Sequence, residues 1–91
     1  MNKAPGYAEA HNGMGHVFMR MDDDRSAIKK FREACRLAPQ NGVYLVNLAE
    51  ALMYSGDFEE ARQRFAEAVQ REPDNGQIEN AWGNALAGQG R

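Results

Sequence analysis

Two histidines are the residues in this chain that first suggest a metal site. His11 and His16 are five residues apart, which places them roughly 140° apart around a helix. Histidines that share a metal ion from one helix are normally spaced by four residues, so that both rings lie on the same face. The spacing in this chain therefore argues against a metal held by these two rings.

The acidic segment DDDRS at residues 22–26 suggests a calcium loop. Side chains with oxygen atoms stand at offsets that an EF-hand loop uses, namely Asp22, Asp24, Ser26 and Glu33. However, Ala27 stands where that loop requires glycine. A helix start is the better interpretation, because Asp23 or Asp24 can accept hydrogen bonds from the first N–H groups and interact favourably with the helix dipole.

Covalent and acid–base catalysis have no support in the sequence. Cys35 is the single cysteine, so it forms no internal disulfide, and no histidine near it in the sequence could activate the thiol. We find no serine or lysine nucleophile with a plausible base, no glycine-rich phosphate loop and no paired carboxylates. We therefore expect no enzymatic activity, no metal and no cofactor.

The composition limits the class of partner. The 91 residues include 11 Lys and Arg against 13 Asp and Glu, for a net charge of −2, whereas nucleic-acid binding needs a clustered basic surface. The sequence has no apolar run typical of a signal peptide or a membrane span. We expect one domain over residues 1–91, located in the cytoplasm, with no nucleic-acid partner and no membrane insertion.

The chain repeats itself at a fixed interval, which the evenly spaced prolines Pro5, Pro39 and Pro73 mark. When residues 24–57 are shifted onto 58–91, identical residues align, among them Ala27/Ala61, Phe31/Phe65, Ala34/Ala68, Asn41/Asn75, Gly42/Gly76 and Leu52/Leu86. A fixed period of 20–50 residues indicates a repeat architecture, with units of about 8–41 and 42–75 and a half unit at 76–91.

Within each unit the apolar residues follow a helical period. One helix per unit carries a stripe at steps of three and four, which we expect to face the core: Ala10, Met14, Val17 and Met21; Tyr44, Leu48 and Ala51; Ile78, Trp82 and Ala85. Capping residues precede the helices, including Asn41, Asn75, and Asp57 with Glu60 as a capping box. The sequence predicts five helices at about 7–20, 24–37, 42–54, 58–71 and 76–88, and no strands.

A repeated helix–turn–helix unit of this length resembles the tetratricopeptide repeat (TPR) family. The resemblance rests on the small residues Gly15, Ala49 and Gly83, on the repeated alanines and phenylalanines of the second helices, and on the prolines between units. It implies an all-α, right-handed superhelix of antiparallel helix pairs with about two and a half repeats. It also implies a non-enzymatic scaffold that binds a peptide segment or a partner protein.

The resemblance further implies a concave groove built by the first helix of each unit. The residues expected to bind a partner there are Asn12, His16, Met19, Val43, Val46, Asn47, Glu50, Met53, Asn80 and Asn84. Asparagine amides offer both a donor and an acceptor to a peptide backbone, while Met19, Val46 and Met53 could accept an apolar side chain. Alternatively, the amides are simply solvated positions on exposed helices.

Some members of the family bind a C-terminal carboxylate of heat-shock chaperones through lysine, arginine and asparagine in this groove. Asn47 matches one of these residues, but Asn12, Gln77 and Ala81 stand where cations are needed. Without cations the charge-assisted hydrogen bonds to a carboxylate are lost. We therefore do not expect this activity.

Two other functions remain open from the sequence. The edges of a short stack are poorly covered, so the chain could self-associate into a homo-oligomer, especially around Ile78 and Trp82. It could also be a repeat region of a larger protein or enzyme, in which case its function would depend on the rest of that protein.

Overall fold

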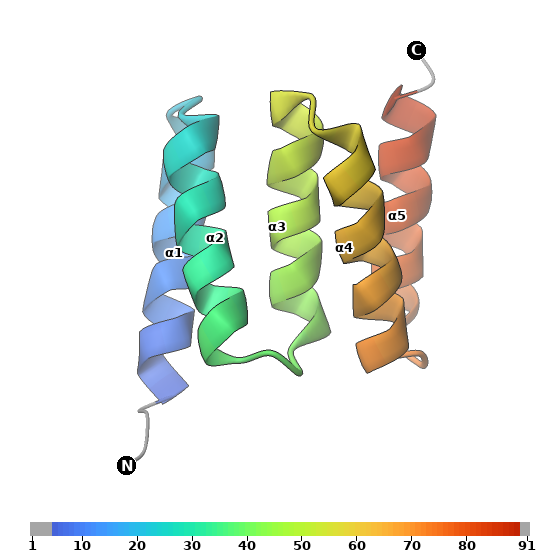
Figure 1. Cartoon of the computed structure of the whole chain (residues 1–91), viewed down its shortest axis with the longest axis horizontal. Helices are drawn as coiled ribbons and strands as arrows, with labels where there is room; N and C mark the ends of the chain where they lie inside the picture. Colours follow the sequence, from blue (N-terminus) through green and yellow to red (C-terminus); the bar gives the residue numbers. More distant parts are fainter. Residues whose placement is uncertain (1–4, 90–91) are drawn as a thin grey trace.

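The computed structural model describes residues 5–89, and these residues form five α-helices joined by short turns (Figure 1). The helices are α1 (Pro5–Arg20), α2 (Asp24–Leu37), α3 (Gly42–Ser55), α4 (Phe58–Arg71) and α5 (Gly76–Gln89). No strand occurs among the described residues. The predicted all-α repeat fold is confirmed, and the predicted helix bounds differ from the observed ones by at most two residues.

Side-chain caps fix the starts of α2 and α3. The carboxylate of Asp23 accepts a hydrogen bond from Ser26 N at 3.2 Å, and the amide oxygen of Asn41 accepts one from Tyr44 N at 3.1 Å. The predicted capping box at Asp57 and Glu60 is wrong. Asp57 makes no cap hydrogen bond to the backbone and instead accepts one from the Ser55 hydroxyl at 2.9 Å.

The helices pack as two antiparallel hairpins followed by a single helix. Helix α1 pairs with α2, α3 pairs with α4, and α5 packs against α3 and α4. In Figure 1, α1 lies behind α2 and α5 lies behind α4. Contacts of α3 with α1 and with α5 place these three helices next to one another in one layer, while α2 and α4 form the other.

The core consists of two apolar clusters on either side of α3. One cluster joins α2, α3 and α4 and contains Ala27, Phe31, Leu48, Ala51, Leu52 and Ala61. The other joins α3, α4 and α5 and contains Leu45, Val46, Ala49, Phe65, Ala68 and Ile78. Fully burying a leucine or phenylalanine side chain contributes about 1.5–3 kcal/mol, so the repeated phenylalanines and the alanines beside them hold successive helices together.

The prediction that the stripe of Ala10, Met14, Val17 and Met21 faces the core is wrong, because all four residues are exposed. Met14, Val17 and Met21 are 42%, 49% and 64% exposed. Ala8 and Gly15 are buried instead. The equivalent positions in α3, Leu48 and Ala51, are buried in the cluster that includes α2 residues. No helix precedes α1 within the described residues to cover its corresponding face.

One polar contact ties the two repeat units together, and another joins the two ends of the second unit. The Arg32 guanidinium of α2 donates two hydrogen bonds to the Glu60 carboxylate of α4, at 2.6 and 2.9 Å. The Glu72 carboxylate, just after α4, accepts a hydrogen bond from Gly42 N at the start of α3, at 2.7 Å. No described helix is long and apolar enough to cross a membrane.

Candidate binding groove

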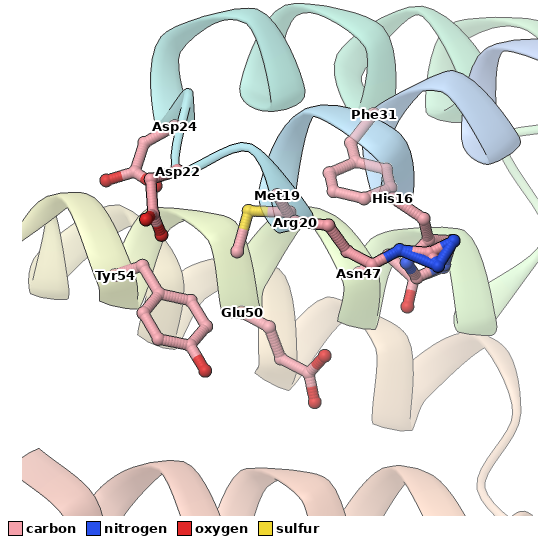
Figure 2. A pocket seen from close by; sticks show the side chains of 9 residues that line it. All are labelled: His16, Met19, Arg20, Asp22, Asp24, Phe31, Asn47, Glu50 and Tyr54. Carbon is pink, nitrogen blue, oxygen red and sulfur yellow. The ribbon is translucent and has the colours of Figure 1, made fainter.

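The layer formed by α1, α3 and α5 contains two adjoining hollows. The α1–α3 hollow has a volume of about 660 Å³ (Figure 2). Its lining comes from both helices, the turn after α1 and two residues of α2, and consists of His16, Met19, Arg20, Asp22, Asp24, Phe31, Asn47, Glu50 and Tyr54. Figure 2 shows Asn47, Glu50 and Tyr54 along α3, with Met19 between Asn47 and the aspartates.

The α3–α5 hollow lies on the other side of α3 and has a volume of about 610 Å³. Its lining is Glu50, Met53, Tyr54, Phe58, Ala81, Asn84, Ala85 and Gly88. Glu50 and Tyr54 line both hollows. The two hollows therefore adjoin along α3, and we call them together the groove.

Hydrogen bonding and ring packing position the polar groups at one end of the groove. The Asn47 side chain donates a hydrogen bond to Asn12 Oδ1 at 2.7 Å. The His16 ring meets the buried Phe31 ring edge-on, with centroids 5.3 Å apart and an interplanar angle of 76°. These contacts hold His16 and Asn47 in place while each keeps further hydrogen-bonding capacity for a ligand.

The α1–α3 hollow carries more negative than positive charge. Its charged side chains are Asp22, Asp24, Glu50 and the single cation Arg20. Within residues 5–89, none of these four side chains forms an ion pair. Neighbouring protein atoms partly desolvate the carboxylate of Glu50 and raise its pKa, although the side chain as a whole is exposed.

The structure brings six of the ten predicted binding residues into the groove. His16, Met19, Asn47 and Glu50 line the α1–α3 hollow, and Glu50, Met53 and Asn84 line the α3–α5 hollow.

The other four predicted residues lie outside the lining. Asn12 is the hydrogen-bond partner of Asn47. Val43 and Asn80 are exposed and line neither hollow, whereas Val46 is 8% exposed and belongs to the core. We therefore do not assign Val46 a contact with a ligand.

Sequence reasoning missed several residues that line the groove. Asp22 and Asp24 are two of these residues. They flank the cap residue Asp23, so the acidic segment as a whole indicates a helix start rather than a binding site. Tyr54 follows Glu50 by four residues, a spacing that could have placed it on the same helix face. Phe58 begins α4 and reaches the groove across the α3–α4 turn, which helix periodicity alone does not reveal.

A smaller hollow of about 280 Å³ lies between α2, α3 and α4 and includes Cys35. Its three arginines form ion pairs with glutamates: Arg32 with Glu60, Arg36 with Glu33, and Arg64 with Glu67. Burial raises the pKa of Cys35 to about 11, which keeps the thiol protonated and unreactive at neutral pH. The described residues contain no group of three or more His, Cys, Asp or Glu side chains placed to hold a metal ion.

The edge predicted for self-association is largely covered. Ile78 is only 2% exposed. The Trp82 ring stacks on Phe65, with centroids 6.1 Å apart and planes within 9° of parallel. The larger exposed apolar side chains at the ends of the stack are Leu86 of α5, Tyr7, Met14 and Val17 of α1, and Met21 in the turn after α1.

Comparison with known proteins agrees with the helix-pair architecture. Residues 22–87 match the tetratricopeptide repeat family. The chain is also similar to a TPR repeat-containing protein of Pseudomonas aeruginosa, with 38% identity over 68 residues. That match covers 75% of this chain and 26% of the relative, so the chain spans about a quarter of the relative's length. The chain therefore belongs to the tetratricopeptide repeat family, whose repeats generally mediate protein–protein interactions.

Proposed function

We propose that residues 1–91 act as one interaction module that binds an extended segment of a partner protein in the groove. The observation that carries this proposal is that two hollows of similar size lie side by side and share Glu50 and Tyr54. A trough that crosses several helices suits an extended chain, because successive side chains of the ligand can enter successive hollows.

The groove combines apolar surface with polar groups that can hold a peptide backbone. Met19 and Met53 offer adaptable apolar contacts, while the amides of Asn47 and Asn84 offer donors and acceptors. This mixture is typical of ligand sites, in which apolar lining provides affinity and a few polar groups fix orientation.

A selection from a random peptide library tests this function. We expect selected peptides to lose at least about tenfold in affinity when Tyr54→Ala and Asn84→Ala are combined, because both exposed side chains line the groove. The matched control combines Gln63→Ala with Gln70→Ala, two exposed positions of α4 outside the groove. Equal losses in both double variants, or none in either, would contradict binding in the groove.

Self-association is the second candidate function, and the exposed face of α1 favours it. Apolar area stays uncovered at Tyr7, Met14 and Val17 of α1 and at Met21 just after it, and large uncovered patches mark interaction surfaces. If a second copy covers this face, light scattering shows a mass that rises with concentration, and Val17→Glu restores the monomer. A constant monomer mass at all concentrations removes this candidate.

A further inference from the structure

The two hollows of the groove differ in chemistry. The α3–α5 hollow is lined largely by apolar groups, among them Met53, Phe58 and Ala85. The α1–α3 hollow contains three carboxylates, from Asp22, Asp24 and Glu50, against the single cation Arg20. Glu50 lines both hollows, but only the α1–α3 hollow adds Asp22 and Asp24, so a ligand that fills both meets the more acidic environment on the α1 side of α3.

The arginine in the α1–α3 hollow lies apart from the aspartates. In Figure 2 the Arg20 side chain extends to the Asn47 side of the hollow, whereas Asp22 and Asp24 lie on the Tyr54 side. Ion pairs do form elsewhere in the described chain, on the surfaces of α2 and α4. The acidic side of this hollow is thus left without a cationic partner within residues 5–89.

Capping of α2 does not account for all of these carboxylates. Asp23 provides the side-chain cap of α2 through its hydrogen bond to Ser26 N at 3.2 Å. Asp24 lies in the first turn and interacts favourably with the helix dipole. Asp22 and Glu50 have neither role, and both line the hollow.

We infer that the segment bound in the groove places a lysine or arginine side chain in the α1–α3 hollow and an apolar side chain in the α3–α5 hollow. This inference rests on the proposed groove function and names the chemistry of its partner. Charge complementarity favours the cation, because the hollow carries three carboxylates against the single cation Arg20, which lies on the Asn47 side, away from the aspartates. A cation beside Glu50 also offsets the desolvation that raises the pKa of this carboxyl group.

The distance between the hollows sets the spacing of the two ligand side chains. The hollows lie on either side of α3, so their separation is close to one interhelical distance, about 10 Å. An extended chain in the polyproline II conformation advances about 3.1 Å per residue with three residues per turn, so side chains three positions apart point to the same face about 9 Å from one another. The basic and apolar residues of the ligand are therefore about three positions apart.

Three synthetic peptides test this preference by fluorescence anisotropy. Each is a labelled decapeptide with blocked ends that consists of serine and glycine except at two positions. One position is leucine in all three peptides. The residue three positions before it is arginine, glutamine or glutamate. We expect the arginine peptide to bind about tenfold more tightly than the glutamine peptide, because hydrogen bonds to charged partners are the stronger ones. We expect the glutamate peptide to bind most weakly.

The protein variant that removes the acidic charge combines Asp22→Asn with Glu50→Gln. Asparagine tolerates the left-handed backbone of Asp22, which has φ 61°, and circular dichroism checks that the double variant stays folded. We expect this variant to lose the preference for arginine over glutamine. Glu59→Gln is the control, because its side chain is 84% exposed on α4 and it should keep the full preference.

The outcomes separate this inference from the groove function. Equal binding of all three peptides, with affinity still reduced by the Tyr54→Ala and Asn84→Ala pair, overturns the cation preference and leaves the groove function standing. Tighter binding of the glutamate peptide overturns the preference as well. If none of the three peptides binds, and the peptides selected from the random library ignore the groove substitutions, the groove function itself is wrong.

Discussion

At the scale of single residues, one repeat position meets three different environments. A Cβ atom added at Gly15 would lie 2.4 Å from Cε1 of Phe31, whereas Ala49, at the same position of the next unit, is fully buried in the cluster that contains Phe65. At Gly83, the matching position of the half unit, an added Cβ meets nothing within 4 Å. The requirement for glycine therefore comes from the neighbouring helix and not from the repeat position itself.

We predict that Gly15→Ala destabilises the protein by about 1–3 kcal/mol, because the buried Phe31 ring must move to admit the methyl group. The matched control, Gly83→Ala, should be neutral or stabilising by up to about 1 kcal/mol, since alanine has the higher helix propensity. Urea unfolding followed by circular dichroism measures both changes. Equal effects at the two positions would contradict this account.

At the scale of elements, the start of α3 depends on a residue from the end of α4. The Glu72 carboxylate accepts hydrogen bonds from Gly42 N at 2.7 Å and from Asn75 Nδ2 at 3.1 Å. An added Cβ at Gly42 would lie 2.8 Å from Ile78 Cδ1, so α3 begins where α4 and α5 approach closely. Glu72 thus satisfies an N-terminal N–H group of α3 and adds a favourable charge there.

We predict that Glu72→Ala lowers the free energy of unfolding by about 1–2 kcal/mol, because it leaves Gly42 N without this acceptor. Glu59→Ala, which removes an exposed glutamate from α4, is the control and should change the stability by less than about 0.5 kcal/mol. Thermal and urea unfolding of both variants provide the measurement. A Glu72→Ala variant as stable as the Glu59→Ala variant would show that the hydrogen bond contributes nothing.

The sequence predicted the helices well because their signals are local. Asn41 caps α3 and Asp23 caps α2 as expected, and the repeat period predicted where the remaining helices lie. The buried face of α1 was not predictable in this way, because burial of Met14 and Val17 depends on a covering helix. Local patterns also gave no signal for Phe58, which reaches the groove through the path of the α3–α4 turn.

At the scale of the whole molecule, α3 contacts every other described helix. Helix α1 contacts α2 and α3, and α5 contacts α3 and α4, with no contact between the described residues of α1 and α5. Stability in such a stack comes from contacts between neighbouring elements. Helices at the ends can therefore open while the centre remains folded.

We predict that backbone amides in α3 exchange at least about tenfold more slowly with deuterium than those in α1 and α5. Phe31→Leu should accelerate exchange in α1, whose Gly15 packs against this ring. Phe65→Leu should accelerate exchange in α5, whose Trp82 stacks on the ring. Mass spectrometry of peptic fragments measures these rates. The same protection in all five helices would show that the chain unfolds only as a single unit.

The central place of α3 also determines how the groove can respond to a ligand. Glu50 and Tyr54, which line both hollows, are carried by the helix with the most neighbours. The outer walls belong to α1 and α5, which are held from fewer sides. We therefore expect α1 and α5 to shift more readily than α3, so that the proposed groove can adapt to ligands of different width while their contacts with α3 stay the same.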